Sequence, residues 1–250
     1  LGASLGPDDQ RTVSDLLIEQ VEFADVILVS KADLVAVEDL AALKSVLRAL
    51  NPQARIEHMS QGQVPLSWVL GTGRFDFERA ATAPGWLAAL RGEVVPESDT
   101  YGIGSLVYRA RRPFHPQRYW DFLQSPWPGG GRLLRSKGWF WLASRPELAG
   151  QYSQAGGILH HGPAGHWWSA VAPALWPQEA EARGRIEANW DVTVGDCRQE
   201  LVFIGQDIDE FALRSALDAC LLDDAEMRLG PAIWTQWPDP FPDWQHADAA

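Results

Sequence analysis

A short apolar run followed at once by a polar loop constrains this chain more than any other feature: Val26-Ile27-Leu28-Val29, then Ser30-Lys31-Ala32-Asp33. Four consecutive apolar residues, three of them β-branched, predict a strand buried on both faces, as in a parallel sheet covered by helices. Open α/β sheets bind ligands beyond the carboxyl ends of their strands. We therefore expect ligand-binding side chains within residues 30–33.

Asp33 and Lys31 suit recognition of a guanine base. A carboxylate can accept two parallel hydrogen bonds from N1–H and the exocyclic amine of guanine, which adenine cannot supply. Lys31 can lay its methylene stem across the purine face while its ammonium stays in water. The pattern resembles the Asn-Lys-x-Asp motif of P-loop GTPases, with Ser30 in place of Asn. Alone it is a weak signal, and an ordinary strand-to-helix loop is the simpler interpretation.

Helices and strands are expected to alternate around this motif. Apolar residues spaced by three and four predict a helix over 9–23, and a leucine stripe over 40–50 predicts another that stops at Asn51-Pro52. Residues 54–57 predict a second strand. Such alternation indicates right-handed crossovers and a parallel sheet, hence an α/β fold.

A second loop is expected at the same edge of this sheet. In GTPases the loop after the next strand covers the other side of the base through backbone groups. Ser60, Gln61 and Gly62 are the candidates here, and a plain glycine turn is the alternative. Beyond a short helix over 65–70, residues 71–96 are rich in Ala, Pro and Gly, which predicts a linker anchored by Trp86.

Composition changes in the second half, because only Trp68 and Trp86 of the 13 tryptophans precede Tyr101. We predict an α/β domain over 1–96, including the linker, and a separate α+β domain over 97–250 with helices on one face of a small sheet. The predicted strands are 103–110, 133–143, 152–158, 166–170 and 200–204, and the predicted helices follow Pro116 and span 210–222. Residues 234–244 are expected to be irregular.

Charge and composition exclude several classes of protein. A net charge of −12 opposes general nucleic-acid binding, which depends on neutralising phosphates. The sequence has no apolar run of about 18 residues and no signal-peptide pattern, so we expect no membrane partner and a cytoplasmic location. Cys197 and Cys220 lie far apart, which argues against a disulfide framework, and Cys220 is expected in the core.

Seven segments together resemble the CobW-type family of P-loop GTPases, in particular its zinc-metallochaperone branch, over about residues 8–244. The implied fold is part of a P-loop GTPase domain followed by a CobW C-terminal domain. The implied function is GTP hydrolysis coupled to delivery of a metal, zinc by expectation, to a client metalloprotein. The matching segments are 15–25, 30–34, 50–54, 112–116, 135–138, 195–205 and 239–242.

Two departures from the family pattern limit this function. The sequence has neither Gly-x-x-x-x-Gly-Lys-Ser/Thr, which cradles phosphates and Mg²⁺, nor the family's Cys-x-Cys-Cys metal motif. We therefore expect an N-terminally truncated chain that alone hydrolyses no GTP, whereas the complete parent uses GTP, Mg²⁺ and Zn²⁺. Ser30 in place of Asn should weaken guanine binding. An incomplete nucleotide domain would also leave an unpaired sheet edge, so homo-oligomers are expected of a natural protein of this length.

Histidines and one cysteine are further candidates for chemistry. His160, His161 and His166 are close enough in sequence to supply zinc ligands, although their spacing matches no closed-site pattern and unliganded loop residues are the simpler interpretation. His115, between two prolines, is expected to be structural. Cys197 stands beside Arg198, which favours a thiolate, against the alternative of an inert substitution. The metal-binding residues remain unknown at this stage.

A basic and aromatic stretch over 132–141 is open to three interpretations. Arg132, Arg135 and Lys137 next to Trp139 could bind single-stranded nucleic acid by stacking, or dock a protein, or pack within the fold. The net charge favours the last. The alternative function for the whole chain is a non-enzymatic module that docks a protein or holds a metal without nucleotide.

Overall fold

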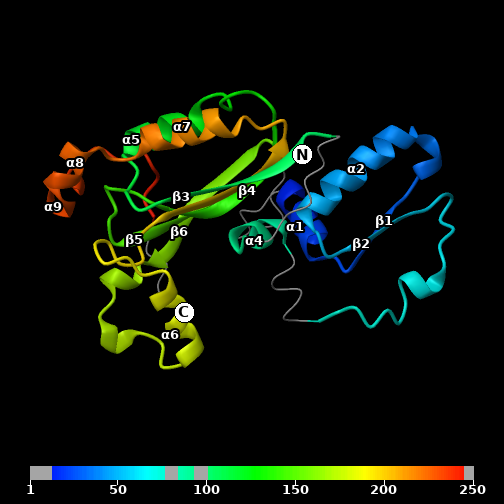
Figure 1. Cartoon of the computed structure of the whole chain (residues 1–250), viewed down its shortest axis with the longest axis horizontal. Helices are drawn as coiled ribbons and strands as arrows, with labels where there is room; N and C mark the ends of the chain where they lie inside the picture. Colours follow the sequence, from blue (N-terminus) through cyan, green and yellow to red (C-terminus); the bar gives the residue numbers. More distant parts are fainter. Residues whose placement is uncertain (1–12, 77–83, 93–100, 245–250) are drawn as a thin grey trace.

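The chain forms two sheets of different kinds. The computed structural model describes residues 13–76, 84–92 and 101–244. Within them lie a two-stranded parallel sheet, β1-β2, and a five-stranded antiparallel sheet in the order β3-β7-β4-β5-β6. Figure 1 shows the parallel pair with α2 beside it at one end of the molecule and the antiparallel sheet at the other. The α/β portion followed by a separate α+β portion is as predicted.

The first portion confirms the expected alternation of helix and strand. Its strands pair in parallel and in register from Val26 to Val29 and from Arg55 to His58. The helix after the first strand ends at Leu50 because Asn51 leaves helical geometry, as its extended backbone shows. The elements are α1 (Val13–Phe23), β1 (Val26–Val29), η1 (Ala32–Leu34), α2 (Val37–Leu50), β2 (Arg55–His58) and η2 (Leu66–Trp68).

The second portion contains the strands predicted over 103–110 and 200–204, and both predicted helices. Its elements are β3 (Ile103–Ala110), α5 (Pro116–Gln124), β4 (Arg132–Trp141), β5 (Leu148–Ala155), β6 (Ile158–His166), η3 (Trp168–Ala170), η4 (Pro173–Leu175), α6 (Ala180–Ala188), β7 (Gln199–Gln206), α7 (Glu210–Cys220), α8 (Asp224–Leu229) and α9 (Pro231–Trp234).

Two of the predicted strands were wrong. Residues 152–158 do not form one strand, because a turn at Gly156-Gly157 separates β5 from β6. Residues 166–170 are mostly a 3-10 helix, and the strand ends at His166. Gly156 has a φ of 57°, a left-handed geometry that suits glycine and turns the chain back on itself.

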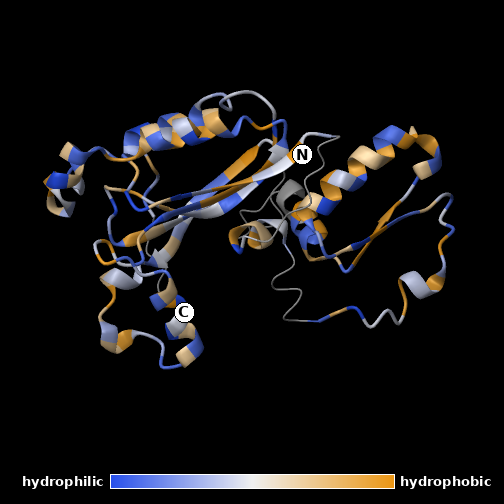
Figure 2. Ribbon diagram, in the orientation of Figure 1, coloured by the Kyte–Doolittle hydropathy of each residue, from blue (hydrophilic) through white to orange (hydrophobic). Residues whose placement is uncertain are grey.

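One face of the antiparallel sheet is covered by α5 and α7 (Figure 1). Apolar side chains of these helices pack on alternate residues of the strands, and the buried cluster includes Tyr119, Leu213, Phe140 and Phe203. Figure 2 shows orange and blue alternating along both helices, as expected when one side of a helix packs and the other meets water. The sequence analysis predicted this arrangement, in which the helices of the α+β portion lie on one face of its sheet.

The opposite face of the sheet is covered by α4 (Gly85–Leu90) and α1. The sequence analysis had no helix at α4 and placed a linker there, although the predicted anchor Trp86 is indeed buried. Trp86 packs in one apolar cluster with Ala49 of α2 and with Val202 and Ile204 of β7. The parallel and antiparallel portions therefore share part of their core.

Candidate functional site

Two loops meet at the carboxyl edge of the parallel pair. The strands are paired along their whole length, so they end together. The N–H of Met59 donates to the carbonyl of Val29 at 2.9 Å, and the N–H of Ala32 donates to the carbonyl of Met59 at 3.4 Å. These bonds join the loop of residues 30–33 to the loop of residues 60–62. We call the two loops together the base edge.

The backbone of the base edge has unusual geometry. Lys31 has a φ of 59° and Gln61 a φ of 51°. Among the non-glycine residues that the structure describes, only these two and Asp207 have a positive φ. Gly62, at 75°, completes a tight turn in which the N–H of Gln63 donates to the carbonyl of Ser60 at 2.9 Å. Left-handed geometry in non-glycine residues costs free energy, and it concentrates at binding sites.

All six predicted base-binding residues are exposed at this edge: Ser30, Lys31, Asp33, Ser60, Gln61 and Gly62. Within the described part of the chain, the side chains of Lys31 and Asp33 form neither hydrogen bonds nor ion pairs, so both remain available to a ligand. A carboxylate, an ammonium on a flexible stem and a turn of exposed backbone amides can together bind a flat heterocycle with adjacent N–H donors.

Asn51 anchors the opposite end of the parallel pair from the base edge, where both strands begin, and the sequence did not predict this role. It is fully buried, and its Nδ2 donates to the carbonyls of Val21 and Ala24, each at 2.9 Å. Its Oδ1 accepts from the N–H of Gln53 and of Ala54. One side chain thus fixes the end of α1, the end of α2 and the start of β2. The sequence signal was the Asn-Pro pair, which indicated only a helix end.

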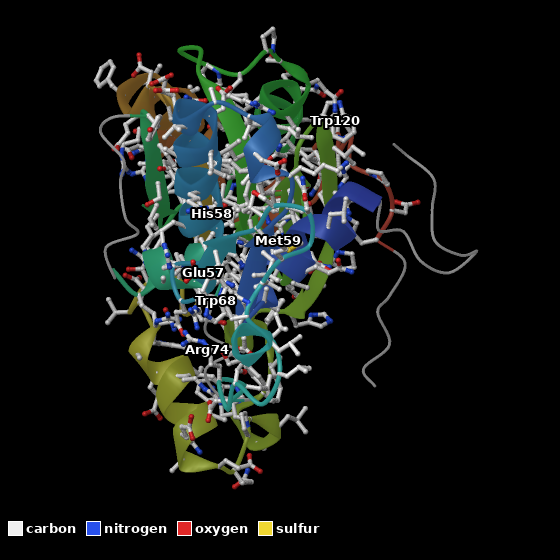
Figure 3. The ribbon with its side chains drawn as sticks, turned by 90° about the vertical axis from the view of Figure 1, so that its right-hand side faces the viewer. Glu57, His58, Met59, Trp68, Arg74 and Trp120 are labelled. Atoms are coloured by element: carbon white, nitrogen blue, oxygen red, sulfur yellow. The ribbon has the colours of Figure 1, made fainter. Side chains whose placement is uncertain are left out.

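The segment after the base edge folds back along β2. Figure 3 shows Glu57 and His58 on this strand, with Trp68 and Arg74 on the segment that follows it. The guanidinium of Arg55 lies 4.7 Å from the centre of the Trp68 ring, and its Nε donates to Glu57 at 3.1 Å. These contacts hold the chain beyond residue 62 against the strand.

The three histidines proposed as zinc ligands do not converge. His160 and His161 are neighbours on β6, so their side chains leave opposite faces of the sheet. The ring of His161 packs edge-on against Trp120 and Phe241. Burial lowers its pKa, which favours the neutral ring. Among the residues that the structure describes, no three His, Cys, Asp or Glu side chains are placed to hold a metal.

Cys197 and Asp196 are structural. Burial raises the pKa of the Cys197 thiol to about 11, and its Sγ lies 3.2 Å from the hydroxyl of Ser169. The thiolate suggested by the neighbouring arginine is therefore not the form present at neutral pH. The carboxylate of Asp196 accepts from the N–H of Trp168 and of Ser169 at 3.0 and 2.9 Å, and so caps η3. The other cysteine, Cys220, is buried in the core as expected.

The basic and aromatic stretch of β4 packs against other parts of the same chain. Arg135 is 1% exposed, and its Nε donates to Glu22 of α1 at 2.9 Å. The ammonium of Lys137 lies 4.8 Å from the centre of the Trp86 ring. Burial raises the pKa of Glu22 more than the nearby Arg135 lowers it. Arg135 and Lys137 therefore pack within the fold, as the third interpretation predicts, whereas Arg132 is exposed.

His115 is structural, as expected. The His115 ring stacks on Trp237 with 5.1 Å between ring centres. The backbone N–H of His115 donates to the carbonyl of Cys220 at 2.8 Å. Burial lowers its pKa.

None of the helices in the described ranges, 13–76, 84–92 and 101–244, is long and apolar enough to cross a bilayer.

Family comparisons divide the chain where the two sheets do. Residues 4–58 match the CobW/HypB/UreG nucleotide-binding domain, and residues 103–221 match the cobalamin synthesis protein cobW C-terminal domain. The first match covers β1 and β2 and includes residues 30–33 of the base edge. The second covers the antiparallel sheet with α5 and α7.

Several known proteins are similar to the chain. A zinc-regulated GTPase metalloprotein activator of Dictyostelium discoideum is 42% identical over 234 residues, which is 93% of this chain and 49% of that protein. A zinc chaperone of Mycobacterium tuberculosis is 32% identical over 249 residues, 98% of this chain and 58% of that protein. The chain thus spans about half the length of these relatives. The Zn(II)-bound YjiA GTPase from E. coli aligns with a TM-score of 0.37 at 18% identity, covering 82% of this chain and 54% of that one.

Proposed function

Because the chain belongs to the CobW-type family of nucleotide-binding proteins, we propose that it supplies the guanine-binding edge and the C-terminal domain of a GTP-dependent metal chaperone. Zinc is the proposed cargo, and a client metalloprotein is the proposed recipient. In this proposal residues 1–96 belong to the nucleotide domain and residues 97–250 form the C-terminal domain. The similarity to a zinc chaperone and to a zinc-regulated GTPase supports the choice of metal.

The observation that carries the proposal is the meeting of two exposed loops at one end of a parallel strand pair. Asp33 lies in the loop after β1 and is free to accept from both donors of a guanine edge. Lys31, beside it, can cover a purine face. The turn at residues 60–62 lies across from them and offers exposed backbone groups.

The proposed contact of the chain with the nucleotide is to its base. The printed sequence contains no phosphate-loop motif, so we assign to these residues no phosphate contact, no Mg²⁺ ligand and no hydrolytic group. When GTP is bound, its γ-phosphate and Mg²⁺ supply the hydrolysable bond and its charge neutralisation. Base selection in this proposal rests on Asp33, and stacking rests on Lys31.

Exchanging the base-selecting group tests the proposal. Xanthine carries a carbonyl where guanine carries its exocyclic amine, so an amide side chain at position 33 pairs with xanthine and a carboxylate pairs with guanine. In the protein that contains this chain, with Mg²⁺ present, Asp33→Asn should lower affinity for fluorescent GTP at least tenfold and raise affinity for XTP, since charge-assisted pairs contribute about 1.5–3 kcal/mol. Competition titrations with GTP, XTP and ATP measure both changes.

The matched control is Asp121→Asn, which alters an exposed carboxylate of α5 on the antiparallel sheet, outside the parallel portion that carries the base edge. It should leave all three affinities unchanged. Equal binding of GTP and ATP by the unaltered protein, together with no effect of Asp33→Asn, would contradict the proposal. That result would favour the alternative of a docking module without nucleotide activity.

A further inference from the structure

A groove of about 310 Å³ lies between the antiparallel sheet and α6, far in sequence from the base edge. Its walls come from the ends of three strands, from the Trp167-Trp168 pair after β6, and from the inner side of α6. In Figure 1 this helix lies on the side of the sheet away from α5 and α7. The volume lies at the lower end of the range for small-ligand sites.

Three tryptophans line the groove: Trp139, Trp167 and Trp168. Trp167 is only 4% exposed, so its ring is fixed by packing. Trp139 is held by an edge-on contact with Trp86, with 6.2 Å between ring centres. Rigid indole walls present flat apolar faces, and these favour flat ligands.

Arg198 crosses the floor between two of these rings. Its guanidinium lies 6.0 Å from the centre of Trp139 and 5.8 Å from that of Trp167. Its Nε donates to Glu200 at 2.8 Å and its Nη1 to the carbonyl of Asp196 at 3.0 Å. Within the described part of the chain Nη2 has no partner, so a fixed cation keeps one donor for a ligand.

The charges lining the groove are opposite in sign to the charge of the chain. Arg185 joins Arg198 there, and Asp196 is the single carboxylate among the lining residues. Both oxygens of Asp196 already accept backbone N–H groups. The side chain of Arg185 is 73% exposed and lies 3.8 Å from its nearest carboxylate, Glu181, a weak pairing that a ligand can replace.

Glu200 does not cancel the charge of Arg198. The same carboxylate also accepts from Nε of Arg109 at 3.0 Å, so one negative charge is shared by two guanidinium groups. These arginines lower the pKa of Glu200 although its burial acts to raise it, so the carboxylate is charged at neutral pH. The three groups together carry one net positive charge, although only Arg198 of them lines the groove, in a chain whose net charge is −12.

From these observations we propose that the groove binds a small planar aromatic anion, with its ring between the tryptophans and its carboxylate, sulfonate or phosphate at Arg185 and Arg198. The flat walls select the ring, and the two guanidinium groups select the charge. The site is separate from the base edge and does not depend on the proposed nucleotide function.

Two dyes with the same ring frame test the proposal. 8-Anilinonaphthalene-1-sulfonate is an aromatic anion with a flat naphthalene ring, and N-phenyl-1-naphthylamine is the same frame without the sulfonate. Fluorescence titration of the full chain should show saturable binding of the anionic dye and at least tenfold weaker binding of the neutral one, because a charge-assisted hydrogen bond contributes about 1.5–3 kcal/mol. Raising the salt concentration should weaken only the anionic dye.

Variants on α6 locate the binding. Arg185→Gln should weaken the anionic dye about tenfold. Arg183→Gln is the matched control, because Arg183 is on the same helix but pairs with Glu187 and does not line the groove. Ala182→Trp should fill the groove and abolish binding. Its control is Ala188→Trp, at an exposed position of the same helix that does not line the groove.

The outcomes separate clearly. Loss of anionic-dye binding in Arg185→Gln and Ala182→Trp, with both controls unchanged and far-UV circular dichroism preserved, supports the site. Equal binding of the two dyes would mean unselective apolar adsorption and would overturn the proposal. Equal effects of Arg183→Gln and Arg185→Gln, or unchanged binding in Ala182→Trp, would also overturn it, because the dye would then bind elsewhere.

Discussion

Arg135 is a charged residue that is buried together with its ion-pair partner, Glu22. Its side chain and that of Glu22 are each 1% exposed, and the guanidinium also donates to the hydroxyl of Ser153 at 3.1 Å. The free energy lost when two charges leave water offsets most of the free energy gained from their attraction. Such a pair therefore adds little net stability while it is intact. Removing one partner is costly, because the other charge is left in a dry site.

The first prediction at the residue scale follows from this asymmetry. Arg135→Met should lower the free energy of unfolding by about 3 kcal/mol at pH 7, whereas the double change Arg135→Met with Glu22→Leu should recover most of that loss. Urea denaturation measures both. Arg183→Met, which breaks an exposed pair on α6, should cost no more than about 0.5 kcal/mol. A double variant no more stable than Arg135→Met alone would contradict the argument.

The same variant should show a pH dependence of known sign. Burial already raises the pKa of Glu22 above its ordinary value of 4.5. In Arg135→Met the attraction that opposed this rise is gone, so the folded protein holds the proton to still higher pH than the unfolded chain. Stability of the variant relative to the unaltered protein should therefore fall as pH rises from 5 to 8. A difference that stays constant over that window would show that Glu22 does not titrate there.

At the scale of elements, a glycine in β4 allows this strand to pack closely against β7. Gly138 has a φ of 152°, and a Cβ there would collide with the carbonyl oxygen of Glu200 and lie 2.9 Å from Cα of Leu201. The contact now explains the residue, because any side chain would push the two central strands apart.

Gly138→Ala should therefore destabilise the protein by about 3 kcal/mol, near the upper end for overpacked positions. Gly162→Ala on β6 is the matched control, since a Cβ there meets nothing within 4 Å. It should change stability by less than about 0.5 kcal/mol. Thermal unfolding of the two variants measures the difference, and similar losses in both would refute the close-packing explanation.

Elements with a regular pattern were predictable, and those set by distant contacts were not. The apolar run of β1 and the leucine stripe of α2 gave both elements from local spacing alone. The β5–β6 turn was missed because the predicted strand was continued through the Gly156-Gly157 pair, which is itself a turn signal in the sequence. The helix α4 was missed because its Ala and Trp residues look like linker until the sheet face that buries them is known.

The candidate site shows the same division. That residues 30–33 and 60–62 share one edge follows from the rule that parallel strands end together. The anchoring of the other end of the strands by Asn51 depends on carbonyls 27 and 30 residues away in the chain, which no local pattern reveals. The proposed groove was likewise invisible, because Trp139, Trp167 and Arg198 come from separate segments.

At the scale of the whole molecule, the two portions share a core around Trp86. Trp86→Ala should remove about 3 kcal/mol of stability and turn one unfolding transition into two, because the apolar contact shared by the portions is lost and the Arg135–Glu22 pair adds little net stability. Hydrogen exchange at β1 and β7 amides during urea unfolding measures this. Trp68→Ala, on η2 outside the shared cluster, is the control. A single transition in Trp86→Ala would mean that other contacts couple the portions.

The buried ion pair has a further consequence for motion between the portions. Apolar surfaces can slide past one another through a continuum of positions, because their attraction has no direction. A guanidinium and a carboxylate in a dry contact admit only one alignment, and a displacement of an ångström or two leaves both charges without water and without a partner. Separation of α1 from β4 is therefore a discrete step between a docked and an undocked arrangement, with a barrier between them and no graded positions along the way.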